Sequence, residues 1–131
     1  MEKIWGFQNE LYTYQCNIFK IEKDILLIKH IGIIEKESYE TVVDFIYDYS
    51  KNLNNKVNLI VDGSNTKKIH PQARKIVLKL HGSKAPTKRV ALIGLNPMLR
   101  ALANLARSLI AIKKLKVFTS IEKALEWIKN K

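Results

Sequence analysis

Features that would place this protein outside the cell or inside a membrane are missing from its sequence. The 131 residues include a single cysteine, Cys16, so no disulfide can form within the chain. This usage is typical of a reducing compartment. The N-terminus lacks the apolar segment of a signal peptide, and no apolar run reaches the roughly 20 residues that span a bilayer. We therefore expect a cytoplasmic protein without a transmembrane segment.

The sequence also has little of what enzymes and metalloproteins need. It contains 5 glycines, none of them in a phosphate-binding loop or a dinucleotide fingerprint. The histidines His30, His70 and His81 are never four residues apart and have no cysteine cluster beside them, which argues against a metal site. Asp62 is the one acid near a strand end, where a lone aspartate more often orders a loop than catalyses. We expect no catalytic residue, no metal and no cofactor.

Negative charge is absent from a long part of the chain. Residues 63–121 contain no Asp or Glu but 13 Lys and Arg. Residues 1–66 carry 7 lysines and 10 acids, a net charge of −3, whereas residues 67–131 carry +14. Part of the total of +11 can reflect a lysine-rich composition, since 19 of the 23 basic residues are lysines. The split between the halves instead suggests that one face meets an anionic surface or the acidic half of another copy.

The spacing of apolar residues predicts strands that alternate with helices. Two strands, at 12–21 and 25–33, are joined by a short turn and form an antiparallel hairpin. A helix at 37–53 has an apolar stripe beside an acidic one. Three strand–helix pairs follow, with a proline or a capping residue where each helix begins. The further strands are expected at 57–62, 89–93 and 116–118, the further helices at 71–80, 97–112 and 121–128, and a loop at 63–69.

The order of elements, β-β-α-β-α-β-α-β-α, indicates an α/β fold. Strands that alternate with helices pair in parallel through right-handed crossovers, and the first hairpin adds an antiparallel strand. We therefore predict a single domain over residues 1–131. It should contain a mixed five-stranded sheet and four helices that cover one or both of its faces.

Small polar residues follow the strands at the edge of the sheet where open α/β sheets bind ligands. These strand ends lead to helix N-termini, whose free N–H groups favour anions. Ordinary turns and caps have the same composition, so a purely structural role stays open. The candidate binding residues are Asp62, Ser64, Asn65 and Thr66 after the third strand, Gln72 in the next helix, and Asn96, Arg100 and Arg107 at the helix after that.

The helix expected at 97–112 combines alanines with large apolar residues around most of its circumference. Arg100, Arg107 and Lys114 are seven residues apart and share one face. Such a helix packs tightly on a sheet, dimerises, or lies on an anionic membrane. Because the basic face is narrow, we expect the helix to be largely buried, with some exposed apolar surface.

Three segments of the chain resemble the STAS superfamily of sulfate-transporter and anti-sigma-antagonist domains. They are LIVDGS at 59–64, followed by a helix with Ala73-Arg74, RVALIG at 89–94, and VFTSIEKALEWI at 117–128. The sequence is most similar to the SpoIIAA-like branch, whose fold is shared with the lipid-binding domain of CRAL-TRIO proteins. The resemblance extends over nearly the whole chain and implies a non-enzymatic regulatory or binding domain with the SpoIIAA-like fold.

One position departs from the pattern of the anti-sigma antagonists. The resemblance implies a phosphorylatable serine at the start of the helix after the third strand. The matching position is Pro71-Gln72, which has no hydroxyl, and Ser64 lies earlier in the chain. We therefore expect no regulatory phosphate at the start of this helix. The resemblance then does not imply partner switching with a kinase for this protein.

Two functional hypotheses from different classes remain. The first is a STAS-like binding module in bacterial signalling, without enzymatic activity, that acts through a protein partner or self-association. The alternative is a lipid- or anion-binding protein that uses its basic C-terminal half at a membrane surface or around an apolar cavity. Nucleic acid is not favoured, because Phe118 is the only aromatic residue in the basic stretch and base stacking needs several.

Overall fold

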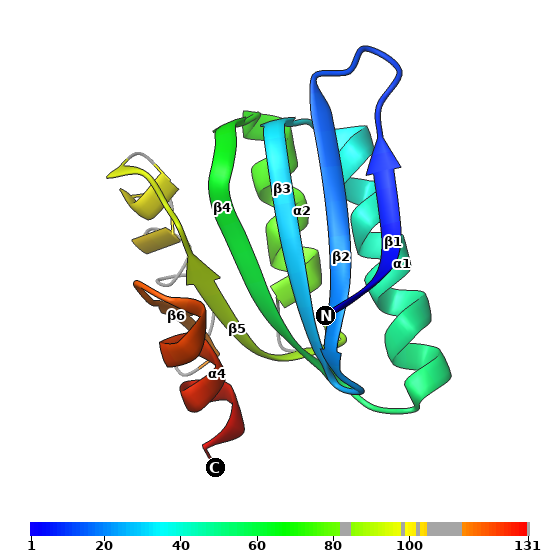
Figure 1. Cartoon of the computed structure of the whole chain (residues 1–131). Helices are drawn as coiled ribbons and strands as arrows, with labels where there is room; N and C mark the ends of the chain where they lie inside the picture. The colour runs from blue at the N-terminus through cyan, green and yellow to red at the C-terminus, as the bar shows by residue number, and fades with distance from the viewer. Residues whose placement is uncertain (82–84, 98, 102, 105–113, 131) are drawn as a thin grey trace.

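The chain forms one layered α/β structure (Figure 1). The computed structural model describes all residues except 82–84, 98, 102, 105–113 and 131. Residues 97, 99–101, 103 and 104 are helical and precede the longest of these gaps. The other elements are β1 (Glu2–Gln8), β2 (Tyr14–Glu22), β3 (Ile25–Ile34), α1 (Lys36–Leu53), β4 (Val57–Ile69), α2 (Pro71–His81), β5 (Thr87–Ile93), β6 (Leu115–Val117) and α4 (Ile121–Lys129).

The six strands form a single mixed sheet in the order of the chain, β1-β2-β3-β4-β5-β6. β1, β2 and β3 are antiparallel neighbours, whereas β3, β4, β5 and β6 pair in parallel. This arrangement confirms the predicted hairpin and the parallel pairing of the strands that alternate with helices. The predicted count of five strands is wrong, because β1 adds a sixth at one edge.

The edge strand β1 is difficult to recognise from alternating residues, because its pairing with β2 is irregular. It pairs with β2 from Glu2 opposite Lys20 to Gln8 opposite Gln15, with a register shift between Lys3 and Trp5. Across that shift Ile4, Trp5 and Phe7 all pack against the same core. A bulge of this kind interrupts the two-residue period on which strand prediction depends.

β4 is 13 residues long and extends to Ile69, so the predicted loop at 63–69 is wrong. Its second half pairs with the end of the 10-residue strand β3, with Ile31 opposite Asn65 and Ile34 opposite Ile69. Register shifts interrupt this pairing twice. Gly63, Ser64 and Asn65 resemble a loop in sequence, but Gly63 and Ser64 occupy the first of these irregularities and Asn65 resumes the pairing.

Helices cover both faces of the sheet, as predicted. The apolar stripe of α1 packs beside α2 on one face, and Figure 1 shows both helices behind the strands. α4 packs on the opposite face, over β4 and β5. Burying a side chain the size of Ile46 stabilises the fold by about 1.5–3 kcal/mol. The fully buried residues of the first face include Tyr14, Ile18, Leu26, Ile28, Val42, Ile46, Leu59 and Val90, whereas Glu37, Glu40, Asp44 and Asp48 of α1 are exposed.

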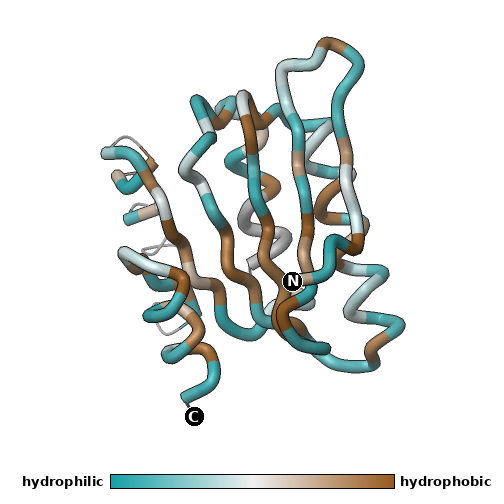
Figure 2. Tube along the Cα trace, in the orientation of Figure 1, coloured by the Kyte–Doolittle hydropathy of each residue, from teal (hydrophilic) through white to brown (hydrophobic). Residues whose placement is uncertain are grey.

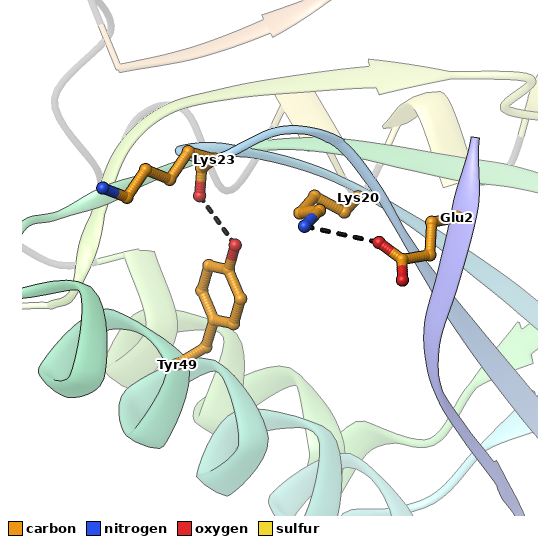
Figure 3. Close-up of polar contacts among 4 residues, drawn as sticks. All are labelled: Glu2, Lys20, Lys23 and Tyr49. Atoms are coloured by element: carbon orange, nitrogen blue, oxygen red, sulfur yellow. Dashed lines mark hydrogen bonds and ion pairs between the residues drawn. The ribbon is translucent and has the colours of Figure 1, made fainter.

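Figure 2 shows that the strands in the middle of the sheet contain long hydrophobic segments, in line with this burial. Two polar contacts then tie the N-terminal elements together (Figure 3). The Tyr49 hydroxyl of α1 donates to the Lys23 carbonyl at the turn between β2 and β3, at 2.7 Å. Glu2 and Lys20 pair at 3.3 Å across β1 and β2, but both are well exposed, so the pair contributes at most about 1 kcal/mol.

Arg89 fixes the C-terminal end of α4 to β5. Its guanidinium donates to the carbonyl oxygens of Trp127 and Asn130 and lies 5.2 Å from the Trp127 ring centroid. We expect Arg89→Leu to destabilise the protein by about 2–3 kcal/mol, because charged hydrogen bonds and a cation–π contact are lost. Urea unfolding measures the effect. Arg89→Lys, which keeps the charge but not the two-pronged geometry, should recover only part of the loss, and full stability of Arg89→Leu would contradict this role.

Candidate binding site at the carboxyl edge of the sheet

Asp62 and Ser64 are joined where β4 departs from regular pairing with β3. Lys29 lies opposite Asp62 and Ile31 opposite Asn65, so Gly63 and Ser64 fall in the irregular step between them. Asp62 Oδ1 accepts the backbone N–H of Ser64 at 2.9 Å and also the Ser64 hydroxyl. This arrangement orders the backbone locally, as expected for a lone aspartate, and leaves the Ser64 side chain at the surface.

Two glycines allow this step to pack directly against the turn after β5. Gly94 has φ +70, and a Cβ added there would lie 2.2 Å from Ser64 Oγ and 2.9 Å from Asp62 Oδ1. A Cβ on Gly63 would lie 2.7 Å from Leu95 Cδ2. Only glycine fits such an approach and such a φ angle without a shift of neighbouring atoms. The middle of β4 and the end of β5 therefore form one closely packed junction.

Asn96 begins the helix that follows this junction. Its Oδ1 accepts the backbone N–H of Leu99 at 2.8 Å, and its carbonyl accepts that of Arg100 at 2.9 Å. Asn96 thus acts as the N-cap that the Asn-Pro pair predicts. Beside it lies an open depression of about 330 Å³, with both apolar and polar residues in its lining. It is lined by Leu95, Pro97, Arg100, Ala101 and Asn104.

The structure brings together four of the predicted site residues: Asp62, Ser64 and Asn96 at the junction, and Arg100 in the depression. Asn65 is the next residue of β4 and is exposed. We call the exposed side chains of Ser64, Asn96 and Arg100, together with the depression, the strand-end surface.

The other predicted residues lie elsewhere. Thr66 is only 6% exposed, and its hydroxyl donates to the His30 carbonyl at 3.2 Å, so it has a structural bond instead of a free side chain. Gln72 is exposed at the start of α2, beyond the end of β4. Five residues of strand, at about 3.3 Å each, separate Ser64 from Ile69, and Gln72 follows after that strand ends. Arg107 falls outside the described residues.

A buried polar cluster lies under the antiparallel half of the sheet. The Tyr14 hydroxyl and His30 Nδ1 share a hydrogen bond of 2.6 Å, and the Tyr39 ring packs edge-on against the imidazole. Burial lowers the pKa of His30 to about 4, although Asp62 acts in the opposite direction. Burial also raises the pKa of the Cys16 thiol to about 12. Both groups are therefore neutral at pH 7, as expected for satisfied core residues and not for a reactive thiol.

The described residues include no group of three or more His, Cys, Asp or Glu side chains placed to hold a metal ion. None of the helices, as far as they are described, has the length and apolar character to cross a membrane.

Comparison with solved structures supports the fold seen here. An uncharacterised DUF3478-family protein from Shewanella loihica PV-4, with a SpoIIAA-like fold, has a TM-score of 0.65 and 22% identity over 92% of this chain and 98% of its own. The unphosphorylated anti-sigma factor antagonist SpoIIAA has a TM-score of 0.64 and 12% identity over 88% and 99% of the two chains. Protein TM1081 has a TM-score of 0.66 and 16% identity over 100% and 98%. At these identities the likeness shows the fold alone.

Sequence comparisons give the family. No curated protein matches the chain. The SpoIIAA-like family model matches residues 25–129, which run from the start of β3 to the end of α4. This match confirms the resemblance found in the LIVDGS, RVALIG and VFTSIEKALEWI segments. The chain belongs to the SpoIIAA-like family.

Proposed function

We propose that this protein is a non-enzymatic regulatory module that binds another protein through its strand-end surface. The observation that carries the proposal is the junction of β4 and β5. There Ser64 packs against Gly94, and Asn96 caps the helix that carries Arg100 beside an open depression. Binding surfaces gain affinity when their groups are ordered before the partner arrives. The close approach at Gly94 supplies that order.

The charge of the surface indicates the kind of partner. Arg100 is exposed, and the one acid of the junction, Asp62, already accepts two hydrogen bonds from Ser64. The half of the chain from residue 67 onward carries +14. We expect a protein partner with an acidic contact surface, for which arginine offers a two-pronged donor.

The same geometry argues against catalysis. A serine nucleophile needs a neighbouring base that is oriented by a third group. Among the described residues, the Ser64 hydroxyl bonds to the Asp62 carboxylate and not to a histidine. The neutral imidazole of His30 is instead hydrogen-bonded to Tyr14. The thiol of Cys16 is buried and protonated.

The structural neighbours support a regulatory role without specifying it. One of them, by its name, antagonises an anti-sigma factor, and its solved form is described as unphosphorylated. Here Pro71 and Gln72 open α2 and neither has a hydroxyl, so we propose that binding is not controlled by a phosphate at that position.

Affinity capture from a bacterial lysate, with mass spectrometry, tests the proposal. Wild type should capture a specific acidic protein, and Arg100→Glu should reduce its recovery at least tenfold, because an attractive charge becomes repulsive. Lys51→Glu makes the same charge change on the exposed C-terminal turn of α1 and should leave recovery within about twofold. Equal loss in both variants, or none in Arg100→Glu, would exclude the strand-end surface as the binding site.

A further inference from the structure

The loop between β1 and β2 is an ordered hairpin tip. The Asn9 side chain accepts the backbone N–H groups of Thr13 and Tyr14, each at 3.0 Å, and donates to the Thr13 hydroxyl at 2.7 Å. The backbone N–H of Tyr12 donates to the Asn9 carbonyl at 3.1 Å. One side chain thus holds both ends of the loop, so the tip presents its central residues in a fixed geometry. We call residues 9–13 the hairpin tip.

Two large apolar side chains occupy the centre of the tip without being buried. Leu11 is 75% exposed and Tyr12 is 78% exposed, against 42% for Tyr47, an exposed residue of α1. Tyr12 also has φ +57, in the left-handed region, where asparagine or glycine fits with less strain. Tyr12 is therefore a bulky aromatic residue at a position where a small polar residue would make the fold more stable. Strain of this kind at an exposed position points to a role in binding.

The tip is fixed to the carboxyl edge of the parallel strands. The Thr13 carbonyl accepts the N–H of Ile33 in β3 at 2.9 Å, and Gly32, with φ +93, leaves room for that carbonyl. Gly32 pairs with Tyr14 on one side and Thr66 on the other. Thr66, near the end of β4, is therefore two strand spacings, about 10 Å, from Tyr14 at the base of the tip. Lys67 and Lys68, both exposed, follow Thr66.

The shape of this region distinguishes it from a typical protein interface. The tip rises beyond the rest of the sheet in Figure 1, and the tube in Figure 2 is hydrophobic at its summit. A single convex apolar tip needs a deep complementary pocket in a protein partner, but it can enter the deformable interfacial layer of a bilayer directly. Tyrosine favours that layer, since its ring is apolar and its hydroxyl polar.

We propose that the hairpin tip inserts Leu11 and Tyr12 into the surface of an anionic bilayer, with Lys67 and Lys68 against the phospholipid headgroups. The apolar side chains contribute burial, and each nearby lysine adds attraction to anionic lipid. The net charge of +11 brings the protein to such a surface. Glu10 is the one acid of the tip and opposes binding. This proposal rests on other residues than the strand-end surface, so either one can fail without the other.

Co-sedimentation with vesicles tests the insertion. Wild type should sediment with vesicles of 70% phosphatidylcholine and 30% phosphatidylserine at 50 mM salt, and much less with phosphatidylcholine alone. The double change Leu11→Ser with Tyr12→Asn should weaken binding at least tenfold without lowering the melting temperature, because asparagine tolerates the left-handed conformation. Lys67→Gln with Lys68→Gln should weaken binding to the anionic vesicles, and Glu10→Gln should strengthen it severalfold.

Three results would overturn the proposal. The first is that wild type does not sediment with the anionic vesicles at low salt. The second is that the Leu11/Tyr12 double variant binds them as wild type does. The third is that wild type is an oligomer by sedimentation equilibrium and the double variant is a monomer, while both bind vesicles equally. The tip would then be a contact between copies of this chain.

Discussion

Gly94→Ala is expected to destabilise the protein by about 2–4 kcal/mol. The left-handed φ of +70 costs an alanine about 1–2 kcal/mol, and the added methyl group meets Ser64 Oγ at 2.2 Å and the Ser64 backbone nitrogen at 2.9 Å. The side-chain oxygen can rotate away, but the backbone nitrogen cannot move unless β4 does. Equilibrium unfolding in urea, at pH 7, measures the loss directly.

Gly6→Ala is the matched control for this substitution. Gly6 lies in β1 without a left-handed φ, and the nearest atoms to an added Cβ are the flexible end of Lys3, at 3.0 Å, and Asn17 Oδ1, at 3.3 Å. The lysine end can shift at small cost, so we expect a change of less than about 1 kcal/mol. Equal stability of Gly94→Ala and wild type would show that β4 and β5 do not meet as closely as the structure has them.

The same substitution links the fold to the proposed function. Adding a methyl group at Gly94 separates Ser64 from the turn that carries Asn96, so the strand-end surface loses its order. At a temperature where Gly94→Ala is still folded, it should therefore recover less of the captured partner than Gly6→Ala. Normal recovery would mean that the surface does not depend on the junction.

The regular elements could be predicted from sequence because their signals are local. The helix α1 has apolar residues at three- and four-residue steps, and all five of them pack in the core: Val42, Phe45, Ile46, Tyr49 and Leu53. The spacing of Thr119 and Glu122 predicts a helix start here, and α4 does begin at Ile121, although its cap is Ser120, which accepts the N–H of Lys123. Where periodicity and caps agree, a short window of sequence contains enough information.

The errors arise where pairing with a distant strand decides the conformation. Residues 63–69 have the composition of a loop, but β3 continues to Ile34 and provides a partner for them. β1 gains its apolar contacts only through a register shift opposite β2. Neither partner can be identified from the residues themselves, since strand register depends on the whole sheet.

The sequence predicts where in the fold the candidate site lies, but not which of the predicted residues are exposed there. The rule that open α/β sheets bind ligands beyond their carboxyl ends selected Asp62, Ser64 and Asn96, which the structure brings to one junction. The same rule selected Thr66, which is buried because the irregular step in β4 changes which residues face the core. The hairpin tip was not predicted, because the exposure and left-handed φ of Tyr12 follow from the turn between β1 and β2.

We expect the protein to lose more stability in acid than protonation of its carboxylates alone would cause, because His30 contributes to the loss. The pKa of a histidine in the unfolded chain is about 6.5, and burial lowers it to about 4 in the folded protein. Between these values the unfolded chain binds the proton more tightly, so stability is complete above pH 6.5 and falls as the pH drops towards 4. A difference of this size corresponds to a loss of about 3 kcal/mol.

His30→Leu should flatten this fall between pH 6.5 and 4, which urea unfolding at several pH values measures. At pH 7 the variant should itself be less stable by about 1–3 kcal/mol, because the buried Tyr14 hydroxyl loses its partner. Carboxylates titrate in both proteins, so the difference between the two pH profiles isolates the imidazole. His70→Gln, at an exposed position, is the control for the replacement of a histidine. If His30→Leu and wild type lose stability in parallel, then His30 accepts its proton without unfolding, and burial does not hold the imidazole neutral.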